Sequence, residues 1–127
     1  MAMFSRHSYV HRVAEISRTM LEASGNITIR GPLTYNCQVS AGADLTMYGE
    51  CRSGDYHAQS TIRAHIVGTG RMGSTRLTVG EGGLIKAAVL YPGVQLKIGA
   101  MSYEVPTILH NTEFQVQEGS FVNLNAS

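Results

Sequence analysis

A repeat of eighteen residues constrains the fold of this chain more than any other feature of its sequence. The segment LEASGNITIRG at 21–31 returns as VSAGADLTMYG at 39–49, and a looser third copy follows seventeen residues later. A repeat this short cannot bury an apolar face alone, so each copy must stack on the next. Because apolar residues alternate between glycine corners, the pattern predicts one turn of a β-solenoid per copy.

The register of the repeat predicts which side chains form the interior. Residues two apart share one face of a strand, and successive turns lie about 4.8 Å apart. Each of three strands should contribute an inward pair, Ile27 and Ile29, Leu45 and Met47, and Ile62 and Ala64. These pairs should stack on one another as inward ladders. Asn26 and Asp44 occupy matching places and should form a short polar ladder at a turn.

The chain has two cysteines, Cys37 and Cys51, whose spacing matches no zinc motif. Two cysteines alone do not make a disulfide framework, so we expect free thiols, with a disulfide only in an oxidising compartment such as the periplasm. An eighteen-residue step places Cys51 at the position of Leu33, an inward apolar position. The thiol is therefore predicted to be buried and to pack as a small hydrophobe.

Residues 1–20 differ from the repeats and are expected to form an N-terminal cap or leader. They contain no glycine, and Val10, Val13, Ile16 and Met20 recur at three- and four-residue steps. This weak helical periodicity predicts a short amphipathic helix that covers the open first turn of the solenoid. The alternative is a leader segment without a role in the fold.

Solenoid turns are predicted over 21–90, followed by antiparallel hairpins over 91–127 in the same domain. Three glycines within 67–74 indicate a corner loop, and the copy at 77–87 fits the repeat with about one inserted residue, as in a β-bulge. Two hairpins are expected later, one turning at Gly99 and Ala100 and one at Glu118 and Gly119. The predicted fold is all-β: a short right-handed parallel β-helix with C-terminal antiparallel hairpins.

The charge of the chain is nearly balanced, which restricts its partners. Ten Lys and Arg against nine Asp and Glu give a net charge of +1, and the basic residues are scattered along the sequence. Such a distribution offers no electrostatic footprint for nucleic acid or acidic lipid. No apolar run approaches the roughly 20 residues of a membrane helix, and the first residues lack the order of a secretion signal. We expect a cytoplasmic chain without membrane insertion.

Histidines and glycines give two weak motifs. His7 and His11 would share a helix face, but neither a third ligand nor a catalytic glutamate stands near them, so no metal site is predicted. The segment 68–73 matches GxGxxG, yet the residues after it continue in a strand pattern rather than a helix. We interpret it as a glycine-rich loop instead of a nucleotide site.

Asp55 and His57, with Glu50 and Arg52 just before them, are the best catalytic candidates. A carboxylate near an imidazole can serve as acid and base. The cluster is expected at a glycine-flanked corner between turns, however, where polar residues serve turn structure anyway. Glu50 with Asp44 could pair as glycosidase carboxylates only if they faced each other across a cleft, which the sequence does not indicate.

Three further chemistries concern sugar binding, acyl transfer and calcium binding. Tyr48 and Tyr56 could stack on sugar rings, although tyrosines commonly pack on the outer faces of solenoids. Hexapeptide acyltransferases need an aliphatic residue every six positions, and the series 79, 85, 91, 97 fails at Lys97. A calcium site would need six to eight oxygen ligands, and the nine acids are spread along the chain. We therefore assign no catalytic, cofactor-binding or metal residue, and predict that the protein is not an enzyme.

The block LYPGVQLKIG at 90–99, with MSYEV at 101–105 and FQVQEG at 114–119 behind it, resembles the C-terminal part of the flagellar assembly protein A family. In that family, β-helix turns of the type seen here precede a YPGV block and a closing hairpin, and the likeness spans about 21–121. This chain lacks the N-terminal domain and the charged coiled-coil insertion of the long family members.

The resemblance implies a cytoplasmic, non-catalytic bacterial scaffold or adaptor of flagellar assembly or polar organisation. Such a protein acts through protein partners and carries no cofactor. Two alternatives share the same scaffold. One is a bactofilin-like cytoskeletal β-helix that self-assembles, which would make the chain a homo-oligomer, and the other is a carbohydrate-active β-solenoid enzyme.

Overall fold

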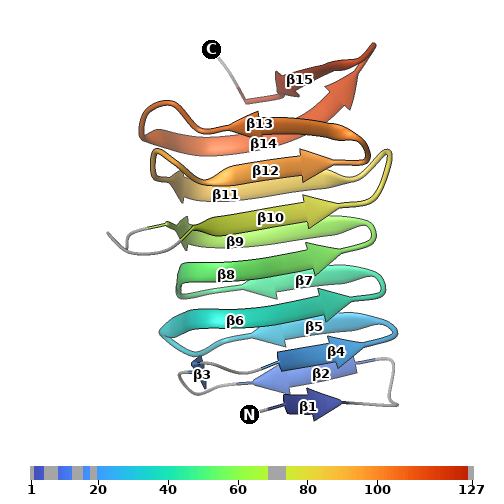
Figure 1. The fold of residues 1–127 in the computed structure, drawn as a ribbon, viewed down its shortest axis with the longest axis vertical. Coiled ribbons are helices and arrows are strands. Elements are labelled where there is room, and N and C mark those ends of the chain that lie inside the picture. The colour runs from blue at the N-terminus through green and yellow to red at the C-terminus, as the bar shows by residue number, and fades with distance from the viewer. Residues whose placement is uncertain (1, 5–8, 13–15, 18–19, 69–73, 126–127) are drawn as a thin grey trace.

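The chain winds into a right-handed β-solenoid with its two termini at opposite ends (Figure 1). The computed structural model describes residues 2–4, 9–12, 16–17, 20–68 and 74–125. All regular structure in this part of the chain is strand, and about 4 turns stack on one another before antiparallel strands begin. The predicted all-β solenoid with C-terminal hairpins is confirmed.

Each turn consists of three strand segments, which stack into three walls. The first wall contains β1 (Ala2–Phe4), β4 (Met20–Ala23), β10 (Thr75–Val79), β12 (Gln95–Ile98), β13 (Met101–Glu104) and the second halves of β6 (Leu33–Ala41) and β8 (Glu50–Ala58). The second wall contains β2 (Tyr9–Arg12), β5 (Asn26–Ile29), β7 (Asp44–Met47) and parts of β9 (Thr61–Val67), β11 (Leu84–Leu90) and β14 (Leu109–Gln117). The third wall contains β3 (Ile16–Ser17) and the remaining ends of the long strands, while β15 (Ser120–Asn123) pairs with β14.

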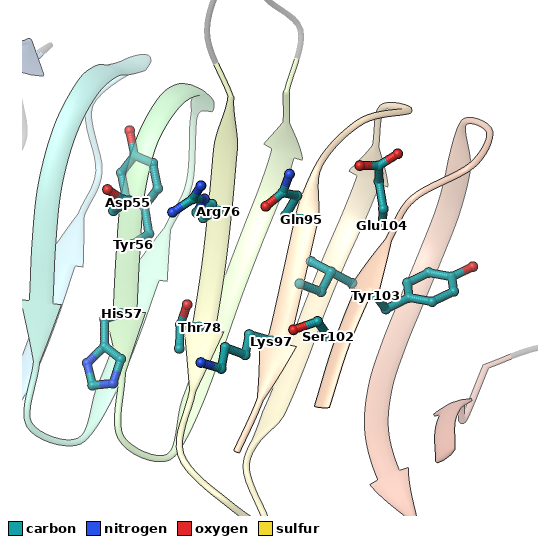
Figure 2. Close-up of a pocket in the computed structure, with 11 residues that line it drawn as sticks. Asp55, Tyr56, His57, Arg76, Thr78, Gln95, Lys97, Ser102, Tyr103 and Glu104 are labelled. Carbon is teal, nitrogen blue, oxygen red and sulfur yellow. The ribbon is translucent and has the colours of Figure 1, made fainter. Parts of the chain in front are cut away.

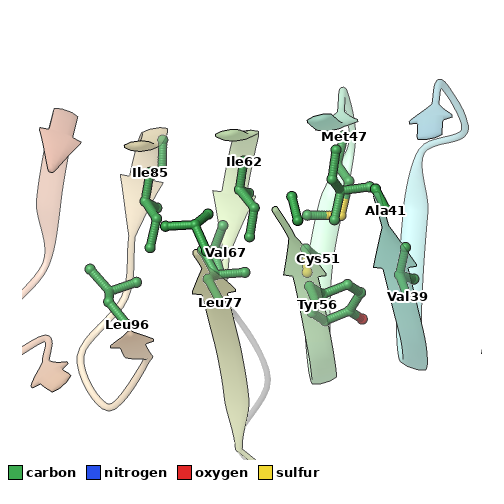
Figure 3. Close-up of a cluster of buried hydrophobic side chains, with 14 of the residues drawn as sticks. Val39, Ala41, Met47, Cys51, Tyr56, Ile62, Val67, Leu77, Ile85 and Leu96 are labelled. Atoms are coloured by element: carbon green, nitrogen blue, oxygen red, sulfur yellow. The ribbon is translucent and has the colours of Figure 1, made fainter. Parts of the chain in front are cut away.

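The eighteen-residue register holds over the first full turns. Leu21 pairs with Val39 and Ile27 with Leu45, and the parallel ladder continues from Leu45 to Ile62. These side chains are at most 2% exposed, because each is covered by the equivalent residue of the next turn. The interior is a single apolar column that runs along the solenoid, as Figure 3 shows for its central part.

Cys51 is buried as predicted, but its expected partner is wrong by one residue. It pairs with Thr34, whereas Leu33 pairs with Glu50 and is half-buried. The step has shortened to seventeen residues because the corner that contains Pro32 is one residue longer than the corresponding corner at Gly49. Register in a solenoid is therefore reset at its corners, where chain length is least constrained.

The helix expected within residues 1–20 is wrong for the part of this segment that the structure describes. It contains β1, β2 and β3, which pair in parallel with β4, β5 and β6. Val10 takes the register position of Ile27, and Ile16 takes that of Thr34. β-branched residues favour strands. Strand pairing also satisfies the backbone N–H and C=O groups at the edge of the next turn, which would stay unpaired if this segment were a helix.

The fourth turn contains two inserted residues rather than one, and they lie in a turn instead of a bulge. Val79 pairs with Ala58 and Leu84 pairs with Thr61, so four residues replace the two that connect the same strands one turn earlier. Gly82, at φ +78°, supplies the conformation that this longer connection needs. The corner loop expected at 67–74 falls largely on 69–73, outside the described residues.

Both predicted hairpins are confirmed. Ile98 pairs with Met101, and Gln117 pairs with Ser120 across a turn in which Glu118 and Gly119 both have positive φ, as a type I′ turn requires. β12 has a double role, because it also stacks in parallel on β10. Three aromatic rings from β13, β14 and β15 pack together at this end, with centroids 5.4 to 6.2 Å apart: Tyr103, Phe114 and Phe121.

Candidate functional site

The outer face of the first wall carries two unbroken rows of polar side chains. The first row follows the strand register through Gln38, Asp55, Arg76, Gln95 and Glu104. The second row, two residues further along each strand, runs through Ser40, His57, Thr78, Lys97 and Ser102. Neighbours within a row are about 4.8 Å apart, which is the spacing of paired strands. We call these two rows the polar face.

The polar face is hollowed over β8, β10, β12 and β13, where Figure 2 shows its side chains. The hollow has a volume of about 640 Å³ and is open to solvent. Acidic groups stand at its two ends, on Asp55 and Glu104, and basic groups stand between them, on Arg76 and Lys97. A surface with charges fixed in this order can recognise a partner of complementary pattern.

The bend of β8 sets the direction of Asp55 and His57. Ser53, at φ +52°, donates its backbone N–H to the Thr75 hydroxyl at 2.8 Å, and Gly54 donates to the Ser74 carbonyl at 2.9 Å. These bonds tie the bend to the next turn. The two side chains consequently lie on a regular strand and point outward, instead of forming the corner cluster expected from the sequence.

Glu50 and Arg52 do not belong to the same site as Asp55 and His57. They precede the bend and lie on the third wall, where Arg52 Nη2 and Glu50 Oε2 are 2.7 Å apart. On the wall of Asp55, the register neighbours are Gln38 and Arg76. The acid–base cluster weighed from the sequence is therefore split between two faces of the solenoid.

The two tyrosines and the polar ladder predicted from the sequence have structural rather than catalytic surroundings. Tyr56 is 1% exposed and points into the core, while Tyr48 is 52% exposed with the Arg30 guanidinium 4.7 Å from its ring centroid, so the two cannot form one sugar platform. The predicted polar ladder is confirmed, since the Asp44 backbone N–H donates to Asn26 Oδ1 at 3.0 Å.

The two weak motifs do not form sites in the described part of the chain. His11 lies on strand β2 rather than on a helix, and His7 lies outside the described residues. Gly68 follows β9 directly and has φ +90°, whereas the rest of its GxGxxG segment lies outside the described residues. Within the ranges described, no three His, Cys, Asp or Glu residues gather as a metal site would require, and no helix could cross a membrane.

A buried cluster of three polar side chains, Cys37, Cys51 and Tyr56, lies beneath the polar face. The Tyr56 hydroxyl donates to the Ser53 carbonyl at 2.6 Å, and the Cys37 thiol donates to the Tyr35 carbonyl at 3.3 Å. Burial raises the pKa of the Cys51 thiol to about 12, against a smaller lowering by its hydrogen bond with Tyr56. Burial also raises the pKa of Tyr56. The Cys51 thiol and the Tyr56 hydroxyl are therefore held neutral at physiological pH.

We expect neither cysteine to react with an alkylating reagent at pH 8 while the protein is folded. Both thiols are at most 1% exposed, and a thiol that is protonated and inaccessible is a poor nucleophile. Mass spectrometry should show no modification in buffer and two modifications in urea. Ser102→Cys, on the exposed polar face, serves as a reactive control, and rapid labelling of the folded wild-type chain would contradict the expectation.

Sequence reasoning missed the polar face, although part of its signal is present. In the first repeats, Gln38 and Asp55 stand at matching outward positions. The connection through residues 68–74 then changes the step to twenty-one residues, so that Arg76 no longer falls on the expected position. Beyond Asp55, the first row can be followed only through the pairing of strands in the structure.

These features define the protein as a β-solenoid with a polar outer face. No protein-family model matches the chain, and comparisons with curated proteins and with solved structures also give no significant match.

Proposed function

We propose that the protein is a non-catalytic, cytoplasmic scaffold or adaptor, related to flagellar assembly protein A, that binds protein partners through the polar face. The observation that carries the proposal is the continuity of the two rows across five strands, from β6 to β13. A partner that lies along the solenoid axis would meet hydrogen-bonding groups at a constant spacing. Recognition by such a surface depends on pattern more than on a pocket.

Rigidity supports this role. The backbone of each wall is hydrogen-bonded to the turns before and after it, and the side chains between the walls are closely covered. A preorganised surface loses little conformational entropy when a partner binds. Charged side chains on it then keep fixed relative positions, which favours partners whose charges match and rejects those whose charges do not.

The sequence likeness to flagellar assembly protein A suggests where partners should be sought. We expect wild-type protein to retain a specific partner from a lysate of a flagellated bacterium. Arg76→Glu together with Lys97→Glu reverses both basic groups of the hollow and should lower the amount retained at least tenfold. A tenfold loss corresponds to about 1.4 kcal/mol of binding free energy.

Arg63→Glu is the control, since it reverses one basic group on the second wall instead of the polar face. Arg63 is exposed and lies 3.5 Å from Asp44, a type of ion pair that contributes about 0–1 kcal/mol to stability. This variant should retain the partner as the wild type does. Equal retention by both variants, or no specific retention by the wild type, would show that the polar face is not the binding surface.

A further inference from the structure

A second hollow lies on the outer side of the second wall, away from the polar face. It extends across β7, β9, β11 and β14, has a volume of about 720 Å³ and is open to solvent. Sites for small molecules typically have volumes of about 300–1,000 Å³. We call this feature the second-wall hollow.

Two cations stand side by side in the second-wall hollow. Arg63 and Lys86 are direct partners in the parallel ladder of β9 and β11, and like charges at paired positions destabilise a sheet. Each has an acidic neighbour on its other side, since Arg63 Nη1 is 3.5 Å from Asp44 Oδ2 and Lys86 Nζ is 4.0 Å from Glu113 Oε1. Both distances exceed the roughly 2.7–2.9 Å of a strong charge-assisted hydrogen bond. Among the described residues no acid lines the hollow, so its centre attracts an anion.

The charge of this pair matches a phosphate monoester better than a carboxylate. A phosphate monoester carries a charge of about −1.5 to −2 at pH 7 and three acceptor oxygens, whereas a carboxylate carries one charge and two oxygens. An arginine binds phosphate through its planar fork of N–H donors, and a lysine binds it as a point charge. A phosphate between Arg63 and Lys86 would therefore offset the repulsion between them.

The rest of the second-wall hollow suits a hydroxylated ring. The register of the flanking pairs places Ala88 between His65 and Asn111, and its small side chain keeps this part of the hollow open. The amides of Asn111 and Asn125 can both donate and accept hydrogen bonds, as a sugar hydroxyl requires. Tyr48, which also lines the hollow and is 52% exposed, adds an aromatic surface for the apolar side of a ring.

We propose that the second-wall hollow binds a phosphorylated sugar, with the phosphate between Arg63 and Lys86 and the sugar ring over Ala88. Binding is reversible and involves no chemical step. The inference goes beyond the scaffold function proposed above, because the site lies on a different wall from the polar face and shares no lining residue with its hollow.

Titration of isotope-labelled protein with hexose phosphates, followed by nuclear magnetic resonance, tests the proposal. The probes are glucose 6-phosphate, glucose 1-phosphate and fructose 6-phosphate. At least one should bind with a dissociation constant below about 1 mM and shift the amide resonances of Arg63, Lys86 and Asn111. Inorganic phosphate should bind at least tenfold more weakly and shift only the first two, and glucose should shift none of them.

Two double variants locate the phosphate. Arg63→Gln with Lys86→Gln should weaken binding of the tightest hexose phosphate at least tenfold. Arg76→Gln with Lys97→Gln makes the same two changes on the polar face and should leave this binding unchanged. The side chains of Arg63 and Lys86 are 53% and 55% exposed, so their replacement leaves the core intact, which circular dichroism verifies.

Ala88→Leu tests the place of the sugar ring without changing any charge. Filling this part of the hollow should remove the preference for the hexose phosphate over inorganic phosphate. The proposal is overturned if no hexose phosphate binds, if inorganic phosphate or adenosine monophosphate binds as tightly as the best of them, or if both double variants lose binding equally. None of these outcomes bears on the partner of the polar face, which the lysate experiment tests separately.

Discussion

Gly54→Ala is expected to lower the free energy of unfolding by about 4 kcal/mol, a large part of the 5–15 kcal/mol typical of a domain. Two penalties add at this position. Gly54 has φ +111°, where an L side chain is strained by about 1–3 kcal/mol. In addition, a methyl group would overlap the backbone carbonyl of Cys37 in the turn below, and such overpacking costs about 1–3 kcal/mol.

Gly82→Ala separates the two penalties. Its φ is +78°, but a methyl group there would meet no atom within 4 Å. The substitution should therefore cost about 1 kcal/mol, from backbone conformation alone. Urea denaturation of the two variants, followed by circular dichroism, measures both losses, and similar values would mean that the stacked turns have room for a side chain after all.

Raising the pH from 9 to 12 should remove about 3 kcal/mol of stability through Cys51 alone, because the slope approaches about 1.4 kcal/mol per pH unit only between the two pKa values. In the unfolded chain the thiol ionises near its ordinary pKa of 9.0, whereas burial raises the pKa to about 12 in the folded protein. The folded state thus holds a proton that the unfolded state releases. Its contribution is complete below pH 9 and is lost as the pH rises toward 12.

Tyr56 should steepen the loss above pH 10, because burial raises its pKa from the ordinary value of 10.0 as well. Urea midpoints measured at pH 8, 9, 10 and 11 define the slope. Cys51→Val removes one titrating group and Tyr56→Phe the other, so each should flatten the curve over its own range. The slopes of stability against pH are compared, because a loss of packing lowers the stability equally at every pH and leaves the slope unchanged. A wild-type curve that is flat above pH 9 would contradict the prediction.

Strand positions were predictable wherever the repeat is regular. The inward ladder from Ile27 through Leu45 to Ile62 needs only alternation and a constant step, and both are present in the sequence. The two hairpins were also predictable, because Gly99 and Gly119 stand between alternating segments. Each of these predictions uses residues that are close in the chain, where geometry leaves few choices.

The N-terminal turn was not predictable in the same way. Val10 and Ile16 fit a helical period as well as a strand, and the segment has no glycine to mark corners. Pairing with the exposed edges of β4, β5 and β6 decided its conformation. A weak local preference yields to tertiary contacts when those contacts satisfy a whole row of backbone groups.

The sequence by itself determined that the chain is a solenoid, because stacking is the only arrangement in which a short apolar repeat buries its side chains. Tertiary structure alone decided which polar residues form one surface. Asp55 and Arg76 become neighbours, and Glu50 is separated from Asp55, because bends and corners of variable length set how each wall aligns with the next. Apolar periodicity records what is buried, whereas the order of groups on the outside depends on the exact length of every connection.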